Sequence, residues 1–221
     1  MSTLLHVAAS PNSKEVSESL RLADAFLETY RAVNPDVSIE TLNLWSEPLI
    51  AFDSVKVGAK AAIAGGGTPV GPEAKAWSEI VATFNRFNAA DSYLFSVPMW
   101  NAGIPYVLKQ YIDIITQPGL LFRLDPRLGY TGLLTGKKAA VIYTSAIYSP
   151  GVSPAFGRDF HSTYFDDWLR FIGITDITTI RFQPTMLTPD ATSARAAATS
   201  QAHEVAKTFG SPATTRAQCT F

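Results

Sequence analysis

Residues 3–9 read Thr-Leu-Leu-His-Val-Ala-Ala, and Ser10 follows them. This nearly continuous apolar run is typical of a strand that is buried on both faces of a parallel sheet. A polar loop over residues 10–16 comes next. Residues 17–34 then carry apolar side chains at helical spacing, and Pro35 ends the pattern. This stretch therefore predicts a strand, a polar loop and a helix.

The same strand–helix unit recurs along the chain. We expect further strands over residues 38–44, 92–97, 139–144 and 175–182, and further helices over residues 72–90, 105–116, 160–171 and 190–209. Because parallel strands need a crossover to return the chain, strict alternation predicts an α/β fold with helices on both faces of a five-stranded parallel sheet. The strand over 38–44 alternates only weakly, which suits a sheet edge.

Two stretches do not follow this alternation. Residues 45–72 contain Gly65-Gly66-Gly67 and three prolines, so we expect irregular chain with at most one short helix. Residues 118–138 contain short apolar pieces between turn residues, which predicts a hairpin-like excursion in contact with substrate or a second subunit.

Composition places the chain among single-domain globular proteins. Of its 221 residues, 47% are apolar and 17% are charged, and no change of composition marks an internal boundary. We therefore predict one domain over residues 1–209 and a flexible C-terminal tail over residues 210–221.

Charge and cysteine content argue against several kinds of partner. The chain has 18 basic and 19 acidic residues, so its formal charge is −1 and no broad attraction to nucleic acid or to an anionic membrane is expected. No apolar run approaches the roughly twenty residues of a membrane helix. We therefore expect a cytoplasmic protein. The single Cys219 and the three scattered histidines predict neither a disulfide nor a metal site.

Ligands of open parallel sheets bind at the carboxyl ends of the strands, which directs attention to residues 10–19, 98–105 and 144–151. The first loop places Ser10, Ser17 and Ser19 at the start of a helix, where free amides attract phosphate. The plainer alternative is that Ser17 is a helix cap and the other serines are solvated.

The second loop reads Pro98-Met99-Trp100-Asn101-Ala102-Gly103-Ile104-Pro105. It combines a flat aromatic, a thioether and an amide, which favours a planar heterocycle packed on apolar atoms. The alternative is a rigid turn with a tryptophan in the core. The motifs G-x-G-x-x-G, G-x-x-x-x-G-K-[ST] and G-x-S-x-G are absent, which argues against a dinucleotide fold, a P-loop and a serine hydrolase.

Several segments are shared with a known family. They are the serine loop, Pro98-Met99-Trp100-Asn101 with Gly103-Ile104-Pro105, Leu108-Lys109-x-Tyr111-Ile112-Asp113, Thr135-Gly136-Lys137-Lys138-Ala139 and Phe171-Ile172-Gly173-Ile174-Thr175. In this order they resemble the FMN-dependent NAD(P)H azoreductases, which are close relatives of the flavodoxin-like quinone reductases. The resemblance covers almost the whole chain. It implies a flavodoxin-like three-layer sandwich with strand order 2-1-3-4-5.

The resemblance also implies a function. FMN would be held non-covalently, reduced by NADH or NADPH, and used to reduce quinones and azo compounds in ping-pong turnover. The phosphate would be held by Ser10, Ser17, Glu18 through its backbone, and Ser19. The isoalloxazine ring would be bordered by Pro98, Met99, Trp100, Asn101 and Ala102, and its pyrimidine edge would be lined by residues 144–148, including Thr144, Ser145 and Tyr148.

Trp100 and Phe122 are candidate aromatic walls for the substrate, although plain hydrophobic packing is the simpler interpretation of Phe122. The resemblance further implies a homodimer with the flavin at the interface. His161 and Tyr164 are candidate interface residues, and a solvated histidine is the simpler interpretation of His161.

Two other classes of protein compete with this interpretation. A flavodoxin-like electron carrier would bind FMN but exchange electrons with proteins, and the charge of −1 argues against it because such carriers are usually strongly acidic. A non-catalytic flavin-binding or regulatory module is suggested by two departures from the family pattern. Glu18 stands where relatives often carry Gln, and Ser145-Ala146-Ile147 stands where many carry Arg-Gly-Gly.

Overall fold

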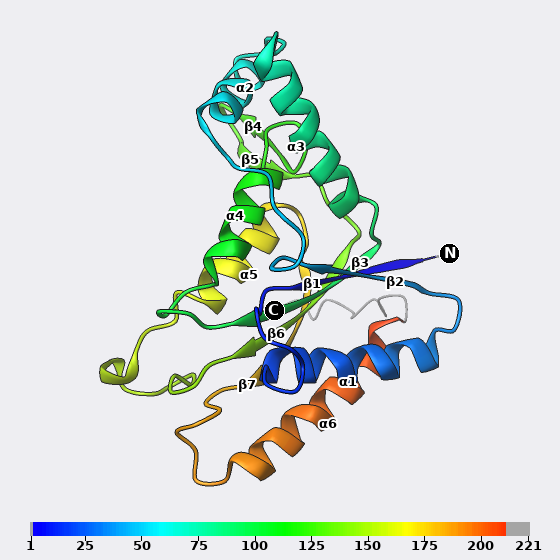
Figure 1. Ribbon diagram of the computed structural model, residues 1–221, viewed down its shortest axis with the longest axis vertical. Coiled ribbons are helices and arrows are strands. Elements are labelled where there is room, and N and C mark those ends of the chain that lie inside the picture. Colours follow the sequence, from blue (N-terminus) through cyan, green and yellow to red (C-terminus); the bar gives the residue numbers. More distant parts are fainter. Residues whose placement is uncertain (1, 211–221) are drawn as a thin grey trace, which may run out of the picture.

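A five-stranded parallel sheet forms the centre of the computed structural model, which describes residues 2–210 (Figure 1). Its strands pair in the order β2-β1-β3-β6-β7. They are β1 (Thr3–Ala8), β2 (Ser38–Asn43), β3 (Ser92–Pro98), β6 (Lys138–Thr144) and β7 (Asp176–Phe182). Since β6 and β7 are the fourth and fifth strands of this sheet along the chain, the predicted order 2-1-3-4-5 is confirmed.

Helices cover both faces of the sheet, and the predicted three-layer sandwich is confirmed (Figure 1). One face carries α1 (Glu18–Val33) and α6 (Ala191–Phe209), which pack together through the rings of Phe26 and Phe209 at 5.5 Å. The other face carries α3 (Pro72–Asn88), α4 (Tyr106–Ile115) and α5 (Ser162–Phe171). Two hydrophobic cores result, one on each side of the sheet.

The central strand β3 carries large apolar residues on both of its faces. Tyr93 and Phe95 point into the core beneath α3, α4 and α5, whereas Leu94 points into the core beneath α1 and α6. Tyr93 stacks on Phe87 with ring centroids 4.5 Å apart, and its hydroxyl donates to the Phe87 carbonyl oxygen at 3.0 Å. Every side chain of a strand covered on both faces meets a core, so periodicity of two is lost.

The stretch that we predicted to be irregular contains α2 (Ser54–Ala64), a helix of 11 residues. Asp53 caps it by accepting a hydrogen bond from the Lys56 amide at 3.1 Å, and the Lys56 ammonium pairs with Glu79 of α3 at 3.2 Å. The capped and paired helix lies against α3 and extends with it beyond the sheet (Figure 1).

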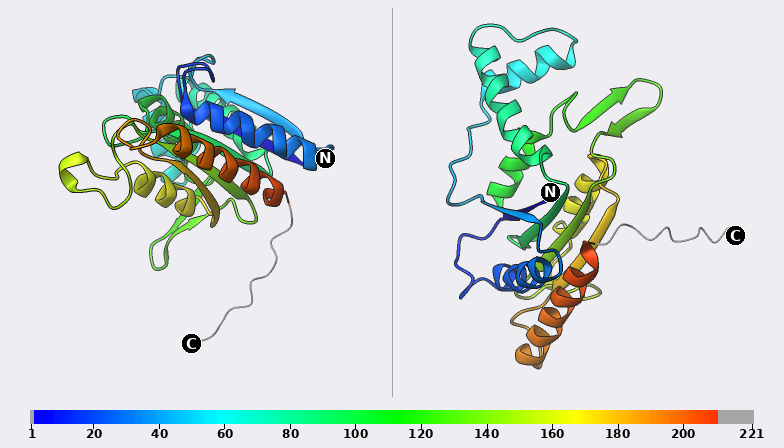
Figure 2. Two further views of the ribbon diagram at one scale, coloured as in Figure 1. Left: turned by 90° about the horizontal axis from the view of Figure 1, so that it is seen from below. Right: turned by 90° about the vertical axis from the view of Figure 1, so that its right-hand side faces the viewer.

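The predicted hairpin is present as β4 (Phe122–Asp125) and β5 (Gly129–Gly132), which pair antiparallel (Figure 2). Its base is fastened to the turn between α5 and β7. The Leu134 amide donates to the Ile172 carbonyl oxygen at 2.9 Å, and a Cβ added at Gly132 would lie only 2.2 Å from the Gly173 nitrogen.

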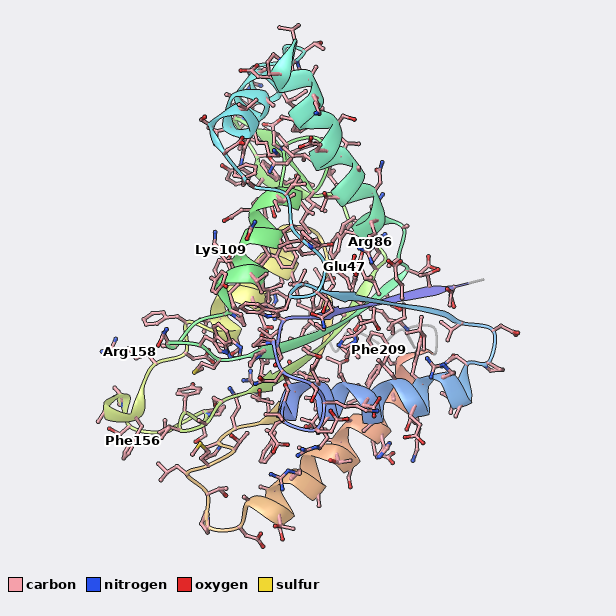
Figure 3. The ribbon with its side chains drawn as sticks, in the orientation of Figure 1. Glu47, Arg86, Lys109, Phe156, Arg158 and Phe209 are labelled. Atoms are coloured by element: carbon pink, nitrogen blue, oxygen red, sulfur yellow. The ribbon has the colours of Figure 1, made fainter. Side chains whose placement is uncertain are left out.

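A longer loop follows β6 and contains a short 3-10 helix, η1 (Pro154–Phe156). Phe156 and Arg158 lie on this loop where it projects beyond the sheet, on the side of α4 that carries Lys109 (Figure 3). Within residues 2–210, no helix is long and apolar enough to cross a membrane. The predicted C-terminal tail, with Cys219, lies outside the described residues apart from Gly210.

Candidate functional site

A cavity of about 180 Å³ lies where β1, β3 and β6 end at the same edge of the sheet. It brings together all three loops that the sequence singled out, as expected for a parallel sheet. The predicted residues that line it are Ser10, Ser17, Glu18, Pro98, Met99, Trp100, Thr144 and Ser145. Ala146, from the predicted stretch 144–148, also lines it, and the further lining residues are Pro11, Asn12 and Thr185.

The start of α1 supplies hydrogen-bond donors to one wall. Ser17 caps the helix by accepting from the Leu20 amide at 3.4 Å, and its hydroxyl lies 3.1 Å from that of Ser19. The amides of Glu18 and Ser19 have no partner within the helix, since the first turn of any α-helix leaves its N–H groups free. Ser17 is therefore a cap, as the plainer interpretation held, but Ser10 and Ser19 are buried and not solvated. The same helix end still offers donors that suit an anion.

Glu18 is held in an ion cluster rather than turned freely to solvent. Arg195 of α6 grips its carboxylate with Nη2 at 2.7 Å and Nε at 3.1 Å, and Arg21 adds a contact at 3.0 Å. The Glu18 side chain is 19% exposed. The negative charge beside the serines is thus compensated by two guanidinium groups.

The second wall is a tight turn after β3. The amide of Trp100 donates to the Gly103 carbonyl oxygen at 2.8 Å, and the Gly103 amide donates back at 2.9 Å. Between them Asn101 and Ala102 have φ angles of 48° and 68°. Left-handed backbone is unfavourable for alanine, and such strain gathers at functional sites.

An aromatic cluster supports this turn from outside. The Trp100 ring lies 5.5 Å from Trp45 and 6.2 Å from Tyr106. Trp45 follows β2 and donates from Nε1 to the Ala9 carbonyl oxygen at 3.0 Å, which ties it to the end of β1. Sequence reasoning missed Trp45. Its only signal was its position directly after a predicted strand.

The third wall is the loop after β6, braced by a segment after β7. The Ser145 hydroxyl donates to the Tyr148 carbonyl oxygen, and the Thr185 amide donates to the Ser145 carbonyl oxygen at 2.8 Å. Thr185 was not foreseen. It follows the predicted strand over residues 175–182, whereas only the loops over residues 10–19, 98–105 and 144–151 were expected to form the site.

Four predicted cofactor residues stand next to the cavity without lining it: Ser19, Asn101, Ala102 and Tyr148. Phe122 lies on the hairpin, where its ring contacts Phe171 at 5.2 Å and Tyr130 at 5.6 Å. Within one chain Phe122 packs as the simpler interpretation held, and its contact with substrate stays a prediction.

A larger open groove of about 740 Å³ adjoins the Trp100 turn. It begins at Gly103 and Ile104 and runs along α4. Its walls include the exposed rings of Tyr106 and Phe160 and the half-buried ring of Tyr164. The small cavity is lined by Trp100 and the groove by Gly103, so both border the turn that contains Asn101 and Ala102.

The predictions for His161 require correction. Its side chain is fully buried, with its ring edge-on to Tyr143 at 4.8 Å, so it is neither solvated nor exposed for contact with a partner. Burial lowers the pKa of His161 to about 4. His6, which is hydrogen-bonded to the Ser96 hydroxyl at 2.8 Å, also has its pKa lowered to about 4 by burial.

Comparison with known proteins agrees with this geometry. A protein-family model described as "flavodoxin-like fold" matches residues 2–206. The FMN-dependent NADH:quinone oxidoreductase of Ruegeria pomeroyi is 48% identical over 190 residues, which cover 86% of this chain and 93% of that protein.

Solved structures give the same result. The azoreductase of Bacillus anthracis strain Sterne superposes with a TM-score of 0.86 at 28% identity, covering 95% of this chain and all of that one. The FMN-dependent NADH-azoreductase of the Ames Ancestor strain, solved in complex with FMN, superposes with a TM-score of 0.85 at 25% identity, covering 96% of this chain and all of that one. This chain therefore belongs to the flavodoxin-like fold family, among relatives that include the FMN-dependent NADH:quinone oxidoreductases.

Proposed function

We propose that this protein binds FMN and acts as an FMN-dependent NADH:quinone oxidoreductase. The observation that carries the proposal is the cavity where the serine-rich start of α1 faces the strained Trp100 turn. The name of a relative that is 48% identical supports the activity, and the solved FMN complex of a structural neighbour supports the cofactor.

The residues present suit the two ends of FMN. Buried hydroxyls of Ser10, Ser17 and Ser19, together with the free amides of α1, provide neutral donors for the phosphate group. A cavity of about 180 Å³ is smaller than the roughly 300–1,000 Å³ of typical ligand sites. We therefore place the phosphate end in the cavity and the ring along residues 98–102, towards the larger groove.

Bound FMN would supply the redox chemistry by accepting hydride from the nicotinamide and passing it to an acceptor. The chain itself would hold the ring in place and shield it from water. Trp100, supported by Trp45 and Tyr106, provides a rigid apolar wall. Backbone groups of the strained turn are fixed by the Phe160 amide, which donates to the Ala102 carbonyl oxygen at 3.1 Å. One open groove beside the ring would admit donor and acceptor in turn, as ping-pong kinetics require.

We propose a homodimer in which the groove along α4 faces a second copy of the chain. Tyr106 and Phe160 are 65% and 62% exposed, and the exposed Phe156 and Ile147 lie on the adjoining loop. Apolar surface of this kind beside a binding site favours burial against a partner.

Reduction of azo compounds and use of NADPH are finer proposals that rest on the resemblance and on the names of structural neighbours. Cytoplasmic location and the single-domain boundary stay predictions.

Anaerobic stopped-flow spectroscopy tests the activity. FMN-loaded protein mixed with NADH should lose its yellow absorption and regain it when menadione or an azo dye is added. Regain of colour only with a protein acceptor would favour the electron carrier. A purified chain that neither is yellow nor takes up FMN would favour the non-catalytic module.

A further inference from the structure

Glu18 belongs to the wall of the proposed phosphate site and also to an ion cluster outside it. It lines the cavity, whereas its two partners, Arg21 and Arg195, do not. We propose that Arg195 is a positioning residue for FMN: it holds the Glu18 carboxylate on the outer side of α1, so that the phosphate meets the helix end without a facing negative charge. This inference rests on the proposed binding of FMN.

The ion pair between Arg195 and Glu18 has a defined geometry. Both Nε and Nη2 of the guanidinium contact the carboxylate, at 3.1 and 2.7 Å, across 177 residues of chain. Arg195 itself is oriented by the Phe182 ring, which lies 5.7 Å from its Cζ atom. A two-pronged contact between planar groups fixes direction as well as distance, which a single contact from lysine would not do.

Arg21 also contacts the Glu18 carboxylate, but less extensively than Arg195 does. It reaches Glu18 through one contact at 3.0 Å, and its other terminal nitrogen donates to the Glu15 carbonyl oxygen at 2.7 Å. The arginine is therefore shared between the carboxylate and the loop before α1. Without Arg195, a single partly exposed contact would hold the Glu18 side chain.

The electrostatic consequence concerns the amino end of α1. A carboxylate in the first turn of a helix is attracted by the same free amides and partial positive charge that attract phosphate. Released from Arg195, Glu18 would compete with the phosphate for that end and repel it. With both arginines in place, the three side chains carry a net charge of +1, from two guanidiniums and one carboxylate.

A purely structural role makes a different prediction. Partly exposed ion pairs contribute little to stability, and α1 already packs on α6 through Phe26, Tyr30 and Phe209. If Arg195 only tied the helices together, its loss would weaken all ligands of the site equally. If it positions Glu18, its loss should weaken only ligands that carry a phosphate, and only while residue 18 carries a negative charge.

The test is a double-mutant cycle on the full-length apoprotein, read by quenching of flavin fluorescence on titration with FMN and with riboflavin, which lacks the phosphate. Arg195→Ala should weaken FMN binding about tenfold or more, because the released Glu18 carboxylate would then repel the phosphate. Riboflavin has no phosphate, so its binding should stay within about twofold. In the Glu18→Gln background, the same substitution should change FMN binding by less than about threefold. Arg31→Ala, which removes a positive charge from the far end of α1, is the matched control and should bind FMN as the wild type does.

Three results would overturn the inference. Equal losses for FMN and riboflavin would assign Arg195 a structural role, and an equal loss in the Glu18→Gln background would mean that it acts on the phosphate directly. Unchanged FMN affinity in Arg195→Ala would remove any role. Failure of the wild type to bind FMN would instead refute the proposed function, and the inference with it.

Discussion

Ala102 is the residue at which strain is most visible. Its φ of 68° lies in the left-handed region, which is costly for residues other than glycine, asparagine and aspartate. Ala102→Gly should therefore raise the unfolding free energy of the apoprotein by about 0.5–1 kcal/mol, after the extra chain entropy of glycine is deducted. Urea denaturation provides the measurement.

The neighbouring Asn101 supplies the matched control. Its φ of 48° is also positive, but asparagine tolerates this region, so Asn101→Gly should gain less than Ala102→Gly. If Ala102→Gly lost stability, as an ordinary alanine-to-glycine change does, the strain assigned to this turn would be wrong.

The two buried histidines predict how stability depends on pH. Burial lowers the pKa of both His6 and His161 to about 4, below the value of about 6.5 in the unfolded chain. Between these values the unfolded chain binds protons that the folded chain does not. The contribution of these two histidines to the unfolding free energy is therefore full above pH 6.5, and it is lost as the pH falls towards 4.

His161→Leu separates one histidine from the rest of the titration. The wild type should lose about 1.4 kcal/mol per pH unit more than this variant within that window, whatever packing energy the substitution itself costs. Urea denaturation at several pH values measures the difference in slope. Parallel pH profiles for the two proteins would show that His161 is not held in its neutral form.

At the scale of elements, the hairpin depends on one glycine at its base. A Cβ at Gly132 would lie 2.2 Å from the Gly173 nitrogen and 2.3 Å from the Ile172 carbonyl carbon, both backbone atoms that cannot turn aside. Gly132→Ala should destabilise the fold by about 1–3 kcal/mol, the usual cost of overpacking. Gly65→Ala, whose nearest contact would be an ordinary 3.4 Å, is the control for a glycine-to-alanine change and should cost far less in thermal unfolding.

The regular elements were predictable because each is dictated by its own residues. Strand β3 carries large apolar residues on both faces, since both faces are buried. Helix α6 is capped by Asp190, which accepts hydrogen bonds from the Thr192 and Ser193 amides at 3.0 and 2.9 Å. Helix α2 was underestimated, because Gly58 and Gly65-Gly66-Gly67 disfavour helix locally. Its Asp53 cap and its contact with α3 outweigh that local preference.

At the scale of the whole molecule, the candidate site divides into a predictable and an unpredictable part. The loops after β1, β3 and β6 converge because parallel strands end at one edge, so a strand pattern is enough to bring Ser10, Trp100 and Ser145 together. Trp45 bonds to Ala9, which is 36 residues away in the sequence, and Arg195 bonds to Glu18, which is 177 residues away. Such contacts depend on how whole helices and loops dock, which no local pattern records.

A crystal structure of this protein grown with FMN tests the central claim most directly. We predict density for the phosphate against Ser10, Ser17 and Ser19 at the start of α1, with the ring along residues 98–102 beside Trp100. Density for the flavin at another surface, or a cavity left empty at saturating FMN while the Trp100 turn keeps its shape, would contradict the account.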